Sequence, residues 1–442
     1  MFKNLLNGLR FPVVEGVLAA AMIVVGYSDN QGENPSITAK LLIGLICVVV
    51  VAYGFLSPLA PIYFWAFTAP LYPASFSSMF LICGTSFTLL YARKKNLWCW
   101  NFSVAGLLFC LWGIASLYWA ENIDFGREGF FNVTLPGIIL SVIISGIREQ
   151  NFRRNLAHIL IIAVSVGCIK TFISWRTGDS LYDKAGRFES FLQPDIFSSW
   201  CLFAGLSLLS LLVKRAKLSS PTQILGVLLL LYIVTGIVLC GYRSTILAMG
   251  AASSVLLILS NRKWFALLML LALGCGIIMI SSNWGVFDIV GQRFDTMSED
   301  RGSGRLDLWN AGLKVFVENP IIGVGWDNFK ISIEKDYGEQ MLPHNLYIQT
   351  FVELGLIGGV LSLAWTVILI RKAWQSPDRN WIFPILLGFL LQGLFLGQFF
   401  YMYFWLVLGC AENSSITQRV DLARPRQYGK QKANLLSNGH KA

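Results

Sequence analysis

His344 has the clearest capacity for chemistry, because it is one of only three histidines in the chain. It follows Pro343 and opens an apolar stretch that is long enough to form a helix. Asn345, Gln349 and Glu353 then recur every four residues, which would place them on one polar face of that helix. A helix N-terminus disfavours a cation, so we expect a lowered pKa for His344 and a neutral imidazole that accepts a proton. The pattern predicts a general base, with a histidine that merely caps a transmembrane helix as the alternative.

Three arginines lie beside apolar segments, where an ionised group is costly. Arg187 precedes an apolar helix, Arg243 interrupts an apolar run, and Arg305 begins a helix whose N-terminus repels a cation. Each could extend its guanidinium to lipid headgroups. Together at one membrane face they would bind an anion, because guanidinium pairs with two phosphate oxygens at once. The arginines therefore predict a phosphate or pyrophosphate site.

Sequence motifs for other chemistry are missing. No GxGxxG follows a predicted strand, and no Walker, HExxH or GxSxG motif occurs. The nine cysteines form no CxxC pair, and the adjacent Glu299 and Asp300 form no Asp-x-Asp pair that would hold a divalent cation. We therefore expect no metal and no cofactor, so that the arginines would have to balance the charge of a phosphate or pyrophosphate directly.

The composition is that of a membrane protein. Hydrophobic residues make up 55% of the chain and charged residues 14%, whereas a soluble domain carries about 25% charged residues. The net charge of +10 comes from short basic clusters between apolar segments, so we expect no nucleic-acid partner. Recurrent apolar segments of bilayer-spanning length predict an all-α polytopic membrane protein with about 12–14 transmembrane helices.

The predicted spans are 11–27, 40–57, 58–75, 76–92, 99–118, 132–147, 156–175, 195–213, 223–241, 244–260, 264–281, 346–370 and 382–409. The first is expected to be a retained helix, because no cleavage site follows it. Segments 58–75 and 76–92 could form one kinked element. Segment 382–409 is too long for one upright helix and is expected to break at Gly397 and Gln398.

Basic residues predict the orientation, because cytoplasmic loops are enriched in Lys and Arg. The short basic loops, expected in the cytoplasm together with both termini, are 93–95, 148–154, 214–217, 262–263 and 371–372. The intervals expected on the opposite side are 28–39, 119–131, 176–194 and 282–345. The expected units are an N-terminal transmembrane bundle, a large outer loop, C-terminal transmembrane helices and a basic tail, over 1–281, 282–345, 346–410 and 411–442.

The large loop contains a predicted amphipathic helix. Its apolar face, with helical spacing, consists of Leu306, Trp309, Leu313 and Phe316. Ser303 is the expected N-cap, and Asn319 with Pro320 is the expected stop. Such a helix between membrane segments is expected to lie on the membrane surface, in contact with lipid or the top of the bundle.

Several stretches resemble the superfamily of O-antigen ligases and O-antigen polymerases. "GSGRLDLWNAGLKVFVENPIIGVGWDNF" has the Arg and Trp of a loop helix and an NPxxGxGxxxF turn, and "HNLYIQTFVELGLIGG" has a His-Asn-x-Tyr and a Glu-x-Gly-x-x-Gly. Upstream, "GRFESFLQPDIFSSW" and "GYRSTILAMG" are similar to the two arginine motifs of that superfamily. Gln-Pro-Asp stands where Pro-Asn is commoner.

The resemblance implies a metal-independent, inverting glycosyltransferase of the GT-C type. It would lie in the inner membrane of a Gram-negative bacterium with its active site facing the periplasm, and its donor would be a glycan on undecaprenyl pyrophosphate. Arg187, Arg243 and Arg305 would hold the pyrophosphate, and His344 would take the proton of the acceptor hydroxyl. The expected function is the O-antigen ligase, which transfers the glycan to a lipid A-core sugar. The alternatives are the polymerase, which joins repeat units on the same carrier, and, more remotely, a transporter with a polar path through the membrane centre.

Overall fold

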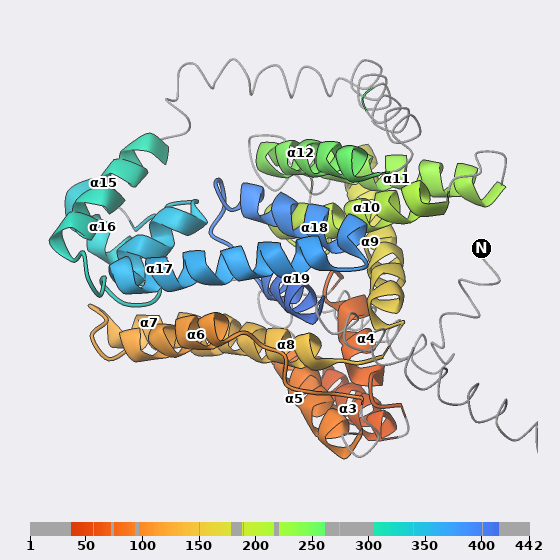
Figure 1. Cartoon of the computed structure of the whole chain (residues 1–442), viewed down its shortest axis with the longest axis horizontal. Coiled ribbons are helices and arrows are strands. Elements are labelled where there is room, and N and C mark those ends of the chain that lie inside the picture. The colour runs from red at the N-terminus through yellow and green to blue at the C-terminus, as the bar shows by residue number, and fades with distance from the viewer. Residues whose placement is uncertain are drawn as a thin grey trace, which may run out of the picture.

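The structure is a computed structural model, and it describes residues 37–55, 57–71, 75–92, 97–149, 151–177, 188, 190–215, 221–260, 274, 305–338, 340–399 and 401–414. Within these residues every regular secondary-structure element is a helix, which confirms the all-α fold for this part of the chain (Figure 1). The helices are α3 (Ile37–Gly54), α4 (Ala60–Thr68), α5 (Ser75–Ala92), α6 (Val104–Ser116), α7 (Ile123–Gly129), the π-helical turn η2 (Phe130–Thr134), α8 (Leu135–Gly146), α9 (Phe152–Thr177), α10 (Pro194–Arg215), α11 (Pro221–Cys240), α12 (Arg243–Leu259), α15 (Arg305–Glu318), α16 (Phe329–Tyr337), α17 (Leu346–Gln375), α18 (Arg379–Gln392) and α19 (Met402–Asn413).

Five helices among the described residues are long and apolar enough to cross a membrane. They are Ile123–Gly146, Phe152–Thr177, Pro194–Lys214, Pro221–Cys240 and Leu346–Gln375. Shorter apolar helices occur at Leu45–Gly54, Leu81–Leu90, Val104–Ser116 and Arg243–Leu259. The predicted spans 11–27 and 264–281 lie outside the described residues, so the total number of transmembrane helices stays a prediction.

Two predicted boundaries differ from the structure, and one predicted break is confirmed. Part of the expected outer interval 119–131 is helical, because α7 begins at Ile123 and continues through η2 into α8. The last helix runs past the expected boundary at residue 410 to Asn413. Segment 382–409 is broken as predicted, since α18 ends at Gln392 and α19 begins only at Met402.

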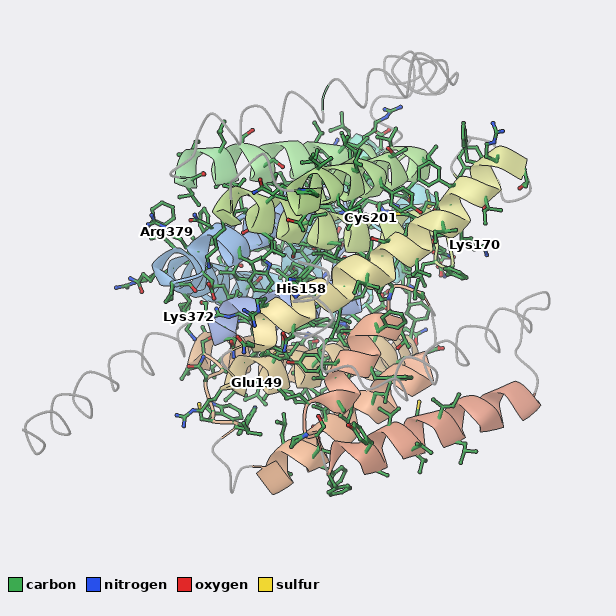
Figure 2. All side chains as sticks on the ribbon, turned by 90° about the vertical axis from the view of Figure 1, so that its right-hand side faces the viewer. Glu149, His158, Lys170, Cys201, Lys372 and Arg379 are labelled. Carbon is green, nitrogen blue, oxygen red and sulfur yellow. The ribbon has the colours of Figure 1, made fainter. Side chains whose placement is uncertain are left out.

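Described residues of three basic loops lie together at one end of the bundle. Asp378, which follows α17, forms ion pairs with Arg153 at 3.1 Å and with Lys214 at 3.7 Å. The ends of α10 and α17 and the start of α9 therefore lie close together. Figure 2 views this end, where Glu149, Lys372 and Arg379 lie. α15 and α16 cover the opposite end (Figure 1). Arg153, Lys214 and Lys372 of the predicted cytoplasmic loops therefore lie at the end opposite α15 and α16, which belong to the predicted outer loop.

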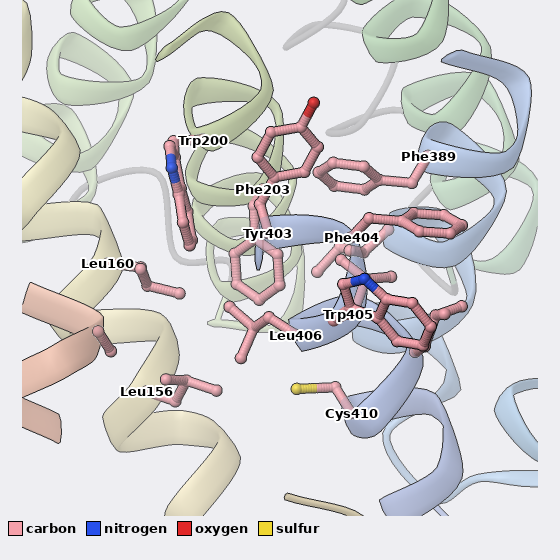
Figure 3. Close-up of a cluster of buried hydrophobic side chains, with 14 of the residues drawn as sticks. Leu156, Leu160, Trp200, Phe203, Phe389, Tyr403, Phe404, Trp405, Leu406 and Cys410 are labelled. Carbon is pink, nitrogen blue, oxygen red and sulfur yellow. The ribbon is translucent and has the colours of Figure 1, made fainter. Parts of the chain in front are cut away.

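Aromatic packing joins the helices between these ends. Trp200 of α10 lies edge-to-face with Tyr403 of α19, at 5.9 Å between ring centroids, and Phe389 of α18 packs on the same tyrosine (Figure 3). A Cβ on Gly137 would come within 2.1 Å of Trp405, so this glycine lets α8 approach α19 closely. Small residues and shape-matched rings are what hold helices together where lipid removes the usual hydrophobic advantage of association.

Candidate functional site

α15 and α16 pack through a small apolar core onto the first turns of α17. Its buried members are Leu308, Ala311, Val315, Val324, Phe329, Ile333 and Val352. The predicted helix over α15 is confirmed, and Leu306 and Leu313 of its predicted apolar face are about half exposed. Trp309 and Phe316 are partly buried against the core. Ser303, the expected N-cap, lies outside the described residues.

α17 is broken where the predicted loop motif meets it. Gly355 has φ 65° and ψ −167°, so the helix hydrogen-bond ladder is interrupted there. The segment 320–325 supplies the missing partners. Val324 and Gly325 donate backbone hydrogen bonds to the carbonyls of Val352 and Glu353, at 3.1 and 2.8 Å. On the other side of the break, Leu356 donates to the carbonyl of Pro320 at 2.8 Å.

The same loop is also attached to α6 and α7. Glu121 donates its N–H to the carbonyl of Val324 at 3.2 Å, and Asn122 donates its N–H to Oδ1 of Asn328 at 2.7 Å. Trp326 is buried and lies edge-on to Phe130 of η2, at 5.5 Å between centroids. The loop that contains the Asn-Pro and Gly-x-Gly motifs therefore packs on several helices at once. These contacts fix the positions of α15 and α16, which lie on either side of the loop in the chain.

Each residue of the predicted polar face of α17 makes hydrogen bonds that hold the structure together. Asn345 is the N-cap, and its Oδ1 accepts from the N–H groups of Tyr347 and Ile348, both at 3.0 Å. Gln349 donates from Nε2 to Oε1 of Glu353 at 3.0 Å. Glu353 is buried, and its carboxylate accepts from the backbone N–H groups at positions 327 and 329 of the loop. These side chains hold the loop and the helix start in place.

Asp327 lies beside this anchor and is strained. It has φ 57°, a conformation that non-glycine residues adopt rarely, and it is buried. Burial is the main cause that raises the pKa of Asp327 to about 6, although Lys330, 3.7 Å away, opposes the shift. Glu128 adds to the increase because a second negative charge disfavours ionisation.

His344 lies just before the N-cap of α17 and adopts φ 48°. The carbonyl of Pro343 accepts a hydrogen bond from Nε1 of Trp309 in α15, at 2.8 Å. On the other side, Leu346 donates its N–H to the carbonyl of Gly393 at 2.7 Å. His344 is thus held between the loop helix and the connection from α18 to α19, in a conformation that the surrounding structure must enforce.

The pKa of His344 is lowered, as the sequence predicted, but for a different reason. Burial is the first cause of the lowered pKa, and the positive charge of Arg305 is the second. The carboxylate of Asp195 acts in the opposite direction on this pKa. The imidazole is therefore neutral at pH 7, and it lies within the electrostatic reach of one arginine and one carboxylate.

Arg305 and Arg243 come together at this site. Arg243 opens α12 directly after Gly241 (φ 68°) and Tyr242, so the turn places it at the start of the helix. Burial lowers the pKa of Arg305, and Arg243 lowers it further by charge repulsion, whereas Tyr242 opposes the shift. Two guanidinium groups that repel each other in a partly buried place form a site that favours an anion. Arg187, the third predicted arginine, lies outside the described residues.

Asp195 and Tyr401 belong to the same site, and the sequence analysis did not single them out. Tyr401 donates from its hydroxyl to Oδ2 of Asp195 at 3.1 Å. Asp195 is in the first turn of α10, where an acidic residue is commonly found for its effect on the helix dipole alone. The available signal was the Gln-Pro-Asp that departs from the commoner Pro-Asn.

A buried network of amides and hydroxyls lies beneath the charged residues. Gln392 donates from Nε2 to Ser199 of α10 and Thr245 of α12, at 2.9 and 2.8 Å. Gln398, at the predicted break, donates to Oε1 of Gln392 at 3.2 Å. The network connects α10, which carries Asp195, to α12, which carries Arg243. It therefore fixes the position of these two helices relative to each other.

Among the described residues, no three His, Cys, Asp or Glu side chains gather as ligands of a metal ion would. The expectation that the reaction needs neither metal nor cofactor stays a prediction. The chemistry available from the residues described is proton acceptance by His344 and anion binding by the arginines.

The fold and the site define a multi-pass helical membrane protein with a partly buried histidine and two arginines at one end. Residues 227–363 match the Wzy_C family, described as O-antigen ligase, which confirms the resemblance over this stretch. No curated protein matches the chain. The matched residues include Arg243, Arg305 and His344. The family implies a membrane enzyme that transfers glycans of the O-antigen ligase or polymerase type and uses lipid-linked glycan substrates.

Proposed function

We propose that the protein is an O-antigen ligase of the inner membrane, which transfers a glycan from undecaprenyl pyrophosphate to a sugar hydroxyl of lipid A-core. The active site would face the periplasm, and the basic end of the bundle would face the cytoplasm. The observation that carries the proposal is the neutral His344 beside Arg305 and Arg243, at the end opposite the basic loops. A transferase needs both a proton acceptor and a cationic stabiliser of its leaving group.

The reaction follows from these roles. The acceptor oxygen attacks the anomeric carbon on the face opposite the pyrophosphate, so the configuration is inverted. The hydroxyl proton moves to His344, and the bond electrons leave with the pyrophosphate, whose charge Arg243 and Arg305 balance. Arg187 is expected as a third contact to the pyrophosphate. No metal ion is required for this charge balance. Holding two lipid-anchored substrates at one membrane surface supplies a further part of the rate.

The α17 break bears on the transporter alternative, because transporters use broken helices to expose backbone groups to a substrate. In this protein the backbone groups around Gly355 hydrogen-bond to the chain's own segment 320–325. Together with the family match, this favours glycan transfer over transport. The polymerase remains the alternative, since it needs the same base and the same cations and differs in its acceptor.

The test is to delete the gene and examine lipopolysaccharide on a gel. A ligase predicts core without O-antigen together with carrier-linked polymer, whereas core with one repeat unit indicates a polymerase. Complementation with His344→Ala is expected to fail at normal protein abundance, because a general base contributes about 10²–10⁴-fold to a rate. Near-normal long-chain lipopolysaccharide from that variant would exclude His344 as the base. Transfer by purified protein in excess EDTA is expected to persist, and its loss would contradict the metal-free reaction.

A further inference from the structure

The connection between α18 and α19 contacts both sides of the site. At its start, the carbonyls of Gly393 and Leu394 accept from Leu346 N–H at 2.7 Å and Asn345 Nδ2 at 3.1 Å. These two donors immediately follow His344. The connection therefore fixes the position of the histidine's backbone relative to α18.

At its other end the connection holds Asp195. Tyr401 donates from its hydroxyl to Oδ2 of Asp195 at 3.1 Å. The backbone carbonyl of Asp195 accepts from the hydroxyls of Ser198 at 3.0 Å and Ser199 at 2.8 Å, and Ser199 is in turn held by Gln392. The carboxylate is thus oriented by a phenol, and its backbone is tied to the amide network. One connection therefore contacts both the carboxylate of Asp195 and the two residues that follow His344.

We propose that Asp195 is a positioning residue for the transfer reaction: its carboxylate, held by Tyr401, stabilises the imidazolium that forms when His344 takes the acceptor proton. The inference rests on the proposed function, because it assumes that His344 is the base. The proton passes from the acceptor hydroxyl to His344, and the pyrophosphate departs with the electrons of the broken bond.

The charges that surround His344 explain why such a carboxylate is needed. Arg305 faces it from α15 and Asp195 from α10, and Arg243 of α12 lies beside Arg305. When His344 gains a proton, the site would hold three positive groups, and the pyrophosphate that offsets them is leaving. The carboxylate of Asp195 is attached to α10, so unlike the leaving group it does not diffuse away. Tyr401, which contacts Asp195, and Tyr242, which acts on Arg305, are further titratable groups in the site.

The experiment measures transfer by purified protein in nanodiscs as a function of pH, with undecaprenyl-pyrophosphate glycan and lipid A-core as substrates. We expect Asp195→Asn to lower kcat by about 10- to 100-fold, a part of what a general base contributes, with KM for the donor little changed. Asp195 raises the pKa of His344. Its removal must therefore move the acid limb of the kcat profile to lower pH. Tyr401→Phe is expected to cause a smaller change in the same direction.

Asp307→Asn is the matched control, because Asp307 is an exposed carboxylate on the first turn of α15. It should leave rate and profile as in the wild type. A lower rate for Asp195→Asn at every pH, with an unmoved acid limb, would mean that Asp195 only supports the fold. Complete loss of activity and of the pH limb would mean that Asp195 itself is the base. An inactive wild-type protein would overturn the proposed function, whereas an active wild type with an unaffected Asp195→Asn variant would overturn this inference alone.

Discussion

Gly323 of the loop and Gly355 of α17 lie backbone against backbone. A Cβ on Gly323 would come within 2.5 Å of the amide nitrogen of Gly355, and a Cβ on Gly355 within 2.6 Å of the amide nitrogen of Gly323. Both have positive φ, of 71° and 65°. Gly323 and Gly355, which belong to the two motifs that carry the family resemblance, therefore form one close backbone contact. A side chain on either glycine would push the loop away from the broken helix.

Replacing Gly355 with Ala is expected to destabilise the protein. The backbone conformation alone costs about 1–3 kcal/mol for a residue with a side chain, and the clash with the carbonyl of Ile321 adds to it. Thermal unfolding of the detergent-solubilised protein measures the effect. Gly250→Ala is the control, because a Cβ there meets no atom within 4 Å. An unchanged unfolding temperature for Gly355→Ala would contradict the close approach.

Asp327→Asn is expected to stabilise the protein at neutral pH. The folded pKa of Asp327 is raised to about 6 from 3.8. The contribution of Asp327 to the free energy of unfolding is therefore fully present below pH 3.8 and is lost as the pH rises through 6. A difference of one pKa unit between the folded and unfolded states corresponds to about 1.4 kcal/mol. Asparagine stays neutral and tolerates the positive φ.

The measurement is the unfolding temperature of wild type and variant between pH 5 and 8. The gain from Asp327→Asn should grow as the pH rises across this interval. Glu334→Gln, at an exposed carboxylate of α16, provides the comparison and should show no such trend. A gain that is independent of pH would mean that Asp327 is ionised in the folded protein throughout this range.

Arg305→Gln is expected to move the acid limb of the activity profile to higher pH. Arg305 lowers the pKa of His344, so its removal raises that pKa and leaves less neutral imidazole at pH 6. This is the opposite of the shift expected for Asp195→Asn. Lys314→Gln removes an exposed charge from the same helix and should leave the limb in place. If Arg305→Gln also leaves the limb unmoved, the two side chains do not interact in the working enzyme.

Arg243→Lys is expected to reduce transfer by about 10-fold or more, because lysine keeps the charge but cannot pair with two phosphate oxygens at once. The loss should appear in kcat/KM for the lipid-linked donor. Arg371→Lys, at an exposed position of the basic end, should be neutral. Wild-type activity of Arg243→Lys would instead support an arginine that only reaches lipid headgroups.

Residue type and local spacing predicted much of the site. A charged or imidazole group at an apolar boundary is costly, so His344, Arg243 and Arg305 could each be picked out alone, and the structure brings them within electrostatic reach of one another. Their roles in catalysis stay predictions. Asp195 and Tyr401 could not be found this way, because an acid in the first turn of a helix has an ordinary local explanation and the tyrosine is distant in sequence.

The polar face of α17 shows a second limit. Helical spacing placed Asn345, Gln349 and Glu353 on one polar face of a helix, next to the candidate base His344. It could not reveal that the ladder breaks at Gly355, since the break depends on hydrogen bonds from residues 320–325. Glu353 binds that loop, so its polarity serves a tertiary contact.

The sealed break in α17 also constrains how the chain enters the membrane. Unpaired backbone groups cost several kcal/mol each in hydrocarbon, so the first turns of α17 are poorly suited to lipid by themselves. Their partners, residues 320–325, precede them in the chain and therefore emerge from the ribosome first. The loop is therefore already made when α17 is synthesised, and the two can fold as one unit. Folding of this region is in this sense an ordered event, in which residues 320–325 are the template for the helix that follows them.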